Sequence, residues 1–315
     1  MRSRLPLLGI LISLVALVGV IVWGSRQEAP ELPDTSREWL ALAGAIALYG
    51  MLTAIRAERW HALLRRAGAR PNRADAYALT VIGYAGNNVL PARAGDAVRV
   101  VLLAPRAATT RRTVIGTLLA ERLLDLAVIV VLFAVVGYAV LGQVSGADAG
   151  VLAAATAGGI ALACAAVLLL RRNERVMGWI RPVLSSTLRL RGAHGAAMLA
   201  LTLLIWLGEA GVWMAAAAAI DFRINPLEGM YLVALASVFS LIPSGPGYVG
   251  TQDAASAIGI KALGGSGSTA VSFILMIRFV LVVPITSLGF LLLAVRYGGL
   301  ANLRRARAEA ETGAG

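Results

Sequence analysis

Residues 76–104 form an apolar segment that is broken near its middle. The stretch Asn87–Arg99 inside it carries two amides, a proline, a glycine, an acid and two arginines. Arginines flank the segment on both sides, and arginine-rich loops face the cytoplasm. Because a single span cannot start and end on one side of a membrane, the pattern predicts a re-entrant hairpin with its tip at Asn87–Gly95. Irregular backbone survives at membrane depth only where protein or a watery cavity surrounds it.

The chain has the composition of a polytopic membrane protein. Of its 315 residues, 58% are hydrophobic and 15% are charged, whereas a soluble domain carries about 25% charged residues. The formal net charge is +12, but the arginines cluster between apolar runs, which indicates cytoplasmic loops rather than nucleic-acid binding. The one cysteine, Cys164, excludes an intramolecular disulfide and a cysteine metal cluster. The two histidines lie far apart, so no metal and no cofactor is expected.

The N-terminal part of the chain predicts two spans joined outside the membrane. Residues 5–23 form too long an apolar run for a signal peptide and lack a small-x-small cleavage site, so we expect a retained first helix. A second span at 39–55 leads to a dense arginine cluster at 56–73, where residues 60–64 are expected to form a separate amphipathic helix on the cytoplasmic surface. Residues 113–141 then span outward.

The C-terminal half predicts similar elements in the opposite orientation. Residues 151–170 return inward to an amphipathic stretch at 176–191, and residues 195–219 cross outward. A second broken apolar segment, 227–263, is followed by a span at 268–295 that ends in a basic and therefore cytoplasmic tail. Counting back from that tail places both ends of the second broken segment outside.

These segments predict an all-α polytopic fold of about six full transmembrane helices plus two oppositely oriented re-entrant broken-helix hairpins in an inverted repeat. The residues expected to shape the hairpin tips are Pro91, Gly95, Pro243, Gly245, Pro246, Gly247 and Gly250. The expected divisions are an N-terminal helix and outside loop at 1–38, a first repeat half at 39–141 with its hairpin at 76–104, a connecting helix and an interfacial helix at 142–194, a second half at 195–295 with its hairpin at 227–263, and a cytoplasmic tail at 296–315.

Polar side chains at the tips and inside the spans predict a binding cavity. An ionisable side chain at the centre of a spanning helix costs roughly 3 kcal/mol or more unless it is paired or hydrated. Half-helix N-termini at the tips would present N–H groups to an anion, and arginine pairs well with phosphate oxygens. A cavity that holds a lipid head group would account for Asn88, Arg93, Asp96, Arg99, Glu121, Arg122, Asp125, Glu209 and Arg278.

Purely structural roles compete with this interpretation. Arg122 and Asp125 are three residues apart and could form an ion pair on one helix. Glu209 could pair with Arg278 and hold the two halves together, and Arg99 could contact lipid phosphate without selectivity. The dipeptide Pro246–Gly247 could be a simple kink in a full span.

Four motifs in the same order resemble the flippase-like transmembrane family, whose best-known members include the membrane part of lysylphosphatidylglycerol synthase. The likeness covers roughly residues 35–295. The family usually has glutamate at the positions of Asp96 and Asp253. Its asparagine–proline–arginine–glycine stretch is matched by Asn88, Pro91, Arg93, Gly95, Asp96 and Arg99, and its Glu-Arg-x-x-Asp motif by Glu121, Arg122 and Asp125. Its second proline–glycine stretch is matched by Pro243, Pro246, Gly247, Gly250 and Asp253, and its late arginine by Arg278.

The resemblance implies lipid translocation between membrane leaflets. We expect a stand-alone member without the soluble aminoacyltransferase domain, which moves a phospholipid or a polyprenyl-phosphate-linked lipid and resides in a plasma membrane with both termini cytoplasmic. The sequence has no Ser-His-Asp set, no phosphate-binding glycine-rich loop and no metal-ligand spacing, so enzyme activity is not expected. The alternatives are a membrane subunit that acts on polyprenyl-phosphate sugars with an acid such as Asp96 or Glu121, and an accessory partner of a glycosyltransferase or lipid-modifying enzyme.

Overall fold

The computed structural model describes residues 5–90, 93–141, 192–240 and 245–299, and a few positions between 157 and 174. Within these ranges the chain is helical and contains no strand, which confirms the predicted all-α class. The elements in chain order are α1 (Leu5–Gly24), α2 (Ser36–Arg66), α3 (Arg73–Val89), α4 (Ala94–Arg106), α5 (Arg111–Leu141), α8 (Ala193–Ala218), α9 (Pro226–Phe239), the 3₁₀ turn η2 (Pro246–Tyr248), α10 (Thr251–Ala262) and α11 (Gly267–Tyr297).

Three helices of the described part, α2, α8 and α11, are long and apolar enough to cross a membrane. At about 1.5 Å per residue, the 31 residues of α2 and of α11 exceed the ~30 Å thickness of a hydrocarbon core. The expected spans at 5–23 and 113–141 are helical, as α1 and α5. The expected span at 151–170 and the interfacial helix at 176–191 lie almost wholly outside the described residues.

Helix α2 is one continuous rod, which corrects the expectation of a span followed by a separate surface helix. It begins with a capping box, in which Thr35 accepts from the Glu38 N–H while the Glu38 carboxylate accepts from the Thr35 N–H. No glycine or proline interrupts residues 51–66. Trp60 and Leu64, expected on the surface, are fully buried. Helix α2 therefore extends to Arg66, because its residues favour helix without a break and because the apolar face with Trp60 and Leu64 is buried.

Helices α3 and α4 form the first hairpin. Leu90 is extended (φ −96°, ψ 143°), as the residue before a proline prefers, and it ends α3. Pro91 and Ala92 lie outside the described residues. At the open end of the hairpin, the Arg70 N–H donates to the Ala107 carbonyl at 3.0 Å. The residues that precede α3 and follow α4 therefore lie side by side, and α3 and α4 form a helical hairpin.

Helices α9 and α10 form the second hairpin, with η2 at its tip. The Asn225 side chain caps α9 in a second capping box with Glu228. Gly259 of α10 lets its backbone approach Leu232 of α9, and beyond α10 Gly265 lies against the Phe222 ring. The helices break close to the interruption predicted at Pro243–Gly250, although residues 241–244, and with them Pro243, lie outside the described part. The alternative of a simple kink in one full span is wrong, because α9 and α10 are separate helices that pack against each other.

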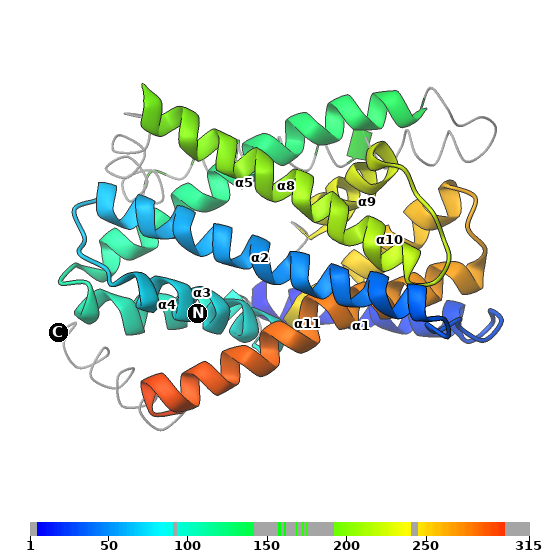
Figure 1. The fold of residues 1–315 in the computed structure, drawn as a ribbon, viewed down its shortest axis with the longest axis horizontal. Coiled ribbons are helices and arrows are strands. Elements are labelled where there is room, and N and C mark those ends of the chain that lie inside the picture. The colour runs from blue at the N-terminus through cyan, green and yellow to red at the C-terminus, as the bar shows by residue number, and fades with distance from the viewer. Residues whose placement is uncertain are drawn as a thin grey trace.

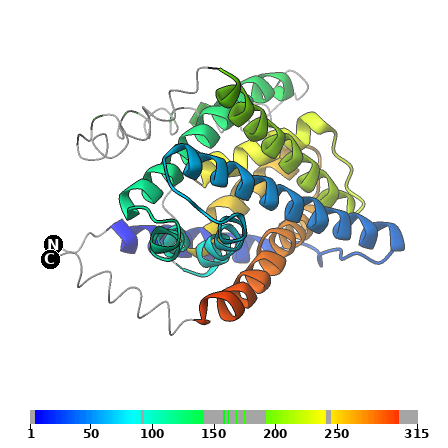
Figure 2. The same cartoon turned by 60° about the vertical axis from the view of Figure 1, so that its left-hand side comes forward.

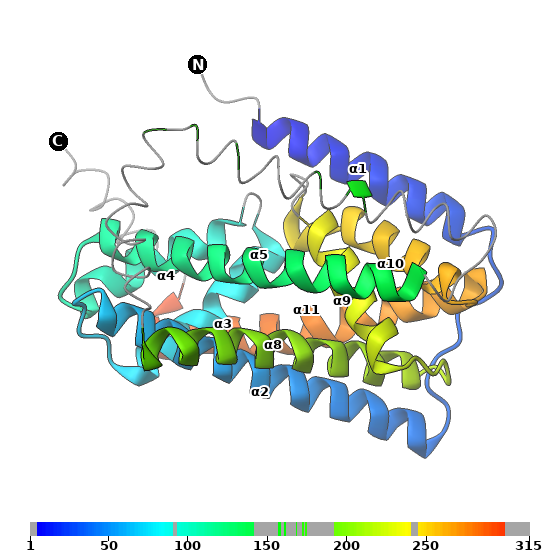
Figure 3. The ribbon, with the colours of Figure 1, turned by 90° about the horizontal axis from the view of Figure 1, so that it is seen from above.

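The two hairpins lie at opposite ends of the long axis, and their tips meet near its middle (Figure 1, Figure 3). Helices α2 and α8 pack side by side along one flank, and α11 packs on α3 from another direction (Figure 2). Gly289 of α11 allows this close approach, because a Cβ there would lie 3.0 Å from the Val81 carbonyl oxygen. The chain therefore contains the order long helix, hairpin, long helix twice.

The far end of α11 is tied to the first hairpin. The Asp75 carboxylate accepts from the Arg296 guanidinium at 3.0 Å and from the Tyr297 hydroxyl at 2.8 Å. Arg106 of α4 lies over the Tyr297 ring, 4.7 Å from its centroid. Arg296 and Tyr297, expected to begin the tail, are thus the last turn of α11, and residues 300–315 of that tail lie outside the described residues.

Candidate functional site

A cavity of about 370 Å³ lies where the two hairpin tips meet, with walls contributed by α2, α3, α5, α8, α9, α10 and α11. Gly247 lies against the backbone of the opposite tip, since a Cβ there would be 3.3 Å from the Asn88 carbonyl oxygen. The Arg93 guanidinium of the first tip lies over the Tyr248 ring of the second, 4.9 Å from its centroid. Two segments separated by about half the chain therefore form one site.

The backbone at both tips adopts left-handed conformations. Gly247 and Gly250 have φ of 63° and 91°, which glycine tolerates without a Cβ clash. Arg93 and Tyr248 have φ of 55° and 56°, a conformation that costs a residue with a Cβ roughly 1–2 kcal/mol. The two strained residues are the ones that stack across the tips. Strain of this kind persists where the surroundings fix it and concentrates at functional sites.

The predicted binding residues divide into two groups. Six of them line the cavity: Asn88, Arg93, Arg122, Asp125, Glu209 and Arg278. The other three are not part of its wall. Asp96 contacts the wall residues Asn87 and Arg122, whereas Arg99 and Glu121 lie behind it, since Arg99 contacts Asp96 and Glu121 contacts Arg99. Six of the nine residues therefore lie at one cavity, and whether each side chain reaches the wall depends on helix packing.

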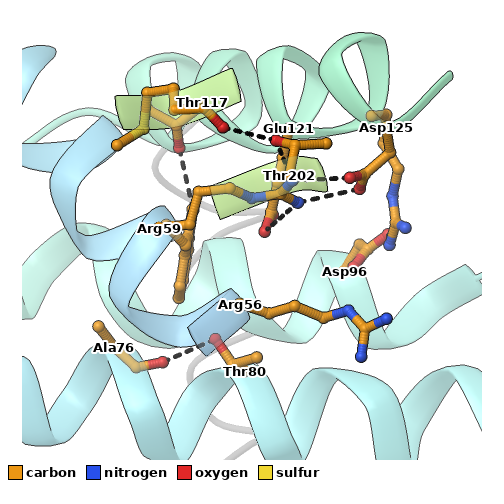
Figure 4. A network of polar contacts seen from close by, with 12 residues as sticks. Arg56, Arg59, Ala76, Thr80, Asp96, Thr117, Glu121, Asp125 and Thr202 are labelled. Carbon is orange, nitrogen blue, oxygen red and sulfur yellow. Dashed lines mark hydrogen bonds and ion pairs between the residues drawn. The ribbon is translucent and has the colours of Figure 1, made fainter. Parts of the chain in front are cut away.

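Arg59 of α2 is fully buried and binds two acids of α5 (Figure 4). Its Nη1 donates to Asp125 Oδ1 at 2.7 Å and to the Thr202 hydroxyl at 2.8 Å, and its Nη2 donates to Asp125 Oδ2 at 3.0 Å. The same Nη2 lies 3.4 Å from Glu121 Oε1. A bidentate pair with a further acid and a hydroxyl is the arrangement that makes a buried guanidinium tolerable.

Arg99 of α4 is the second fully buried arginine. It lies 3.4 Å from the other oxygen of Glu121 and 3.5 Å from Asp96, and its guanidinium packs on the Trp60 ring at 3.9 Å. Asp96 in turn accepts from Arg122 of α5 at 3.3 Å. Arg99 is therefore buried between helices, and the alternative that it contacts lipid phosphate at the membrane surface is wrong.

The two structural ion pairs considered as alternatives do not form. Arg122 pairs with Asp96, and Asp125 pairs with Arg59. Glu209 pairs with Arg56 of α2 at 2.5 Å. Arg278 donates to Asp253 at 2.6 Å, to the Tyr248 carbonyl at 3.1 Å and to the Gly247 carbonyl. Helix packing explains these pairs. Helix α2 packs on α8 and brings Arg56 to Glu209, whereas α10 packs on α11 and brings Asp253 to Arg278.

The cavity ion pairs consist of five arginines and five acids, namely Arg56, Arg59, Arg99, Arg122 and Arg278 with Asp96, Glu121, Asp125, Glu209 and Asp253. Sequence reasoning placed Arg56 and Arg59 in a cytoplasmic loop and did not assign Asp253 to the binding site. The unbroken helical pattern through residue 66 was the available signal for the two arginines. The matched motif contained Asp253.

The two hairpins share one more arrangement. Asp96 and Asp253 each occupy the third position of the returning helix, in α4 and α10. Each carboxylate pairs with an arginine of the next long helix, Arg122 at 3.3 Å and Arg278 at 2.6 Å. Asp253 also accepts from the Gly250 N–H at 2.8 Å, which fixes the start of α10. Equivalent positions in the two halves therefore perform equivalent structural roles.

Residues 7–289 match the family described as the lysylphosphatidylglycerol synthase TM region. The chain belongs to this family. No curated protein matches the sequence. The membership confirms the resemblance drawn from the motifs and identifies a membrane protein of a lipid-related family.

The motifs of the lysylphosphatidylglycerol synthase TM region family converge on the cavity. Asn88 of the first stretch donates to the Thr286 hydroxyl at 3.0 Å, which fixes the first tip on α11. Arg122 of the second motif and Arg278 of the last helix bind the returning helices of the two hairpins. Among the described residues, no three His, Cys, Asp or Glu side chains lie together as a metal site would require.

Proposed function

We propose that this protein moves a lipid between the leaflets of a membrane, as a flippase-like transporter of a phospholipid or a polyprenyl-phosphate-linked lipid. The observation that carries the proposal is the charged cavity between the hairpin tips, enclosed by helices whose outer surfaces are apolar. Its volume of about 370 Å³ lies within the ~300–1,000 Å³ typical of small-molecule sites. It suits a head group, while the acyl chains remain outside in the hydrocarbon.

Apolar side chains on the outer surface support a bilayer around the bundle. Val131 of α5, Leu207 of α8 and Leu291 of α11 are 61%, 58% and 58% exposed. Exposed apolar surface of this extent is costly in water and favourable against lipid tails. The contrast between this surface and the ion-paired interior is the arrangement that a head group would need in order to cross.

The proposed topology is an inverted repeat with re-entrant hairpins that enter from opposite sides. It is supported by the hydrogen bond between Arg70 and Ala107, by the opposite placement of the hairpins, and by the equivalent Asp96 and Asp253. The arginine-rich ends of α2 and α11 would face the cytoplasm of a plasma membrane. Both termini would then be cytoplasmic, and α1 would be a full span.

Cysteine accessibility tests this topology. In a Cys164→Ser background, Ala74→Cys and Thr110→Cys flank the first hairpin, and Arg223→Cys and Lys261→Cys flank the second; all four positions are exposed. We expect a membrane-impermeant thiol reagent to label the first two from one side and the last two from the other. Labelling of positions 74 and 110 from different sides would mean that the first segment crosses the membrane, and the proposed cavity topology would fail.

A transport role without catalysis is supported by the state of the acids. Each of the five carboxylates near the cavity forms an ion pair with an arginine, and an acid engaged in this way is not free to contact a substrate. The expected partners are membrane lipids, with a glycosyltransferase or lipid-modifying enzyme as a further binding partner. A protein that is inert alone but co-purifies with such an enzyme would favour the accessory role.

Arg278→Ala tests the site in a leaflet-exchange assay with the purified protein in liposomes. The exchange rate is expected to fall by roughly tenfold or more, because Asp253 loses its partner and the carbonyls of the second tip lose their donor. Arg223→Ala, an exposed arginine of the α8–α9 loop, is the matched control and should exchange lipid at the wild-type rate. A folded Arg278→Ala protein with wild-type exchange would count against the proposed site.

A further inference from the structure

The formal charge of the site is not balanced. The cavity ion pairs hold five arginines and five acids, so their charges sum to zero. Arg93 also lines the cavity and adds one positive charge. An uncompensated charge in a low-dielectric environment is unfavourable, so the site favours an occupant that carries the opposite charge.

Arg93 is the cavity cation that lacks a carboxylate within the described part of the chain. Its guanidinium contacts the Tyr248 ring at 4.9 Å, a cation–π contact that leaves its N–H groups available to an acceptor. Asp96, three residues further on, is engaged by Arg99 and Arg122. The side chain is neither fully buried nor fully exposed. Arg93 is therefore a fixed, accessible positive charge at the junction of the two tips.

Buried polar atoms without partners supply a second, independent observation. Arg56 Nη1, Trp206 Nε1 and Asn87 Oδ1 have no hydrogen-bond partner among the described residues, and all three residues line the cavity. Asn87 is more than nine-tenths buried. Two of these atoms are donors that cannot accept, so the missing partners include oxygens. A buried donor left unsatisfied is costly, so these side chains are expected to turn toward a polar occupant of the cavity.

Resting on the proposed function, we infer that the cavity selects a head group with one net negative charge: a lipid phosphodiester whose remaining part is uncharged and hydroxylated. Arg93 binds the phosphodiester oxygens, and Arg56 and Trp206 donate to the other oxygens. A single negative charge neutralises the site. A zwitterionic head group leaves it at +1, and a doubly charged phosphomonoester or diphosphate leaves it at −1. This charge balance favours a phospholipid over a polyprenyl-diphosphate-linked lipid.

Binding of short-chain lipids to the detergent-solubilised full-length protein tests the inference without requiring transport. The probes are dihexanoyl phosphatidylglycerol, dihexanoyl phosphatidylcholine and dihexanoyl phosphatidic acid, with bound species measured by native mass spectrometry. We expect the wild-type protein to bind the glycerol lipid roughly tenfold more tightly than the other two. Arg93→Gln should remove that preference, and Arg93→Lys should retain most of it. Glycerophosphoglycerol, which has the same head group without acyl chains, distinguishes a lipid site from a site for a soluble phosphodiester.

The outcomes separate this inference from the proposed function. Equal wild-type affinity for the glycerol and choline lipids overturns the inference, as does an Arg93→Gln protein with an unchanged preference. If Arg93→Gln does not fold, the wild-type comparison and Arg93→Lys decide the matter. Selective binding with no leaflet exchange in liposomes refutes transport and leaves the inference intact. Exchange of all three lipids at equal rates with equal affinities supports transport and refutes the charge selection.

Discussion

Replacing Arg59 by methionine is expected to lower the free energy of unfolding by about 3–5 kcal/mol, the cost of breaking a buried ion pair from one side. Arg59 is fully buried and binds Asp125 through two nitrogens at 2.7 and 3.0 Å. The variant leaves the Asp125 carboxylate without its cation and Glu121 with Arg99 alone. Thermal unfolding of the detergent-solubilised protein, with the loss of helical signal as readout, measures the change.

Two companion variants make the Arg59 result specific. Arg66→Met removes an exposed arginine from the end of the same helix and should change stability by less than about 0.5 kcal/mol. Arg59→Met combined with Asp125→Leu removes both members of the pair and should recover part of the loss, because no uncompensated carboxylate remains at position 125. If the double variant is as unstable as the sum of its single changes, the pair is not the origin of the effect.

The hairpins could be predicted from the sequence because their signal is local. Arginines on both sides of residues 76–104 and the break at Pro91 required a segment that returns, and the structure divides that segment into α3 and α4. The second segment, expected at 227–263, corresponds closely to α9 through α10 at 226–262. The positions of the arginines along the chain thus predict which apolar segments must turn back.

The ion-pair partners could not be predicted because they depend on helix rotation and packing. Arg59 and Asp125 are 66 residues apart, and Arg56 and Glu209 are 153 residues apart. The ion pair considered within one helix, Arg122 with Asp125, does not form. Helix α2 places Arg59 against Asp125, and α4 places Asp96 against Arg122. The rule that arginines mark cytoplasmic loops also misplaced Arg56 and Arg59, since it counts arginines without locating the end of a 31-residue helix.

The first hairpin depends on a glycine at position 95, and Gly95→Ala is expected to destabilise the protein by about 3 kcal/mol, the upper range for overpacking. A Cβ at this position would meet the Gly83 carbonyl oxygen and would lie 2.6 Å from the Asn87 backbone nitrogen. Both atoms belong to the backbone of α3, which cannot rotate away as a side chain can. Relief therefore requires α3 and α4 to separate, which displaces Asn88 from the cavity wall.

Gly50→Ala is the matched control, and it should shift stability in the opposite direction. Gly50 lies inside α2 with no atom within 4 Å of an added Cβ, so the gain in helix propensity, up to about 1 kcal/mol, is not offset by a clash. Unfolding temperatures in the same detergent compare the two variants directly. A Gly95→Ala protein that matches or exceeds the stability of Gly50→Ala would show that α3 and α4 do not pack closely. In that case the first tip would not be held at the cavity, and the contact between the two tips would lose its structural support.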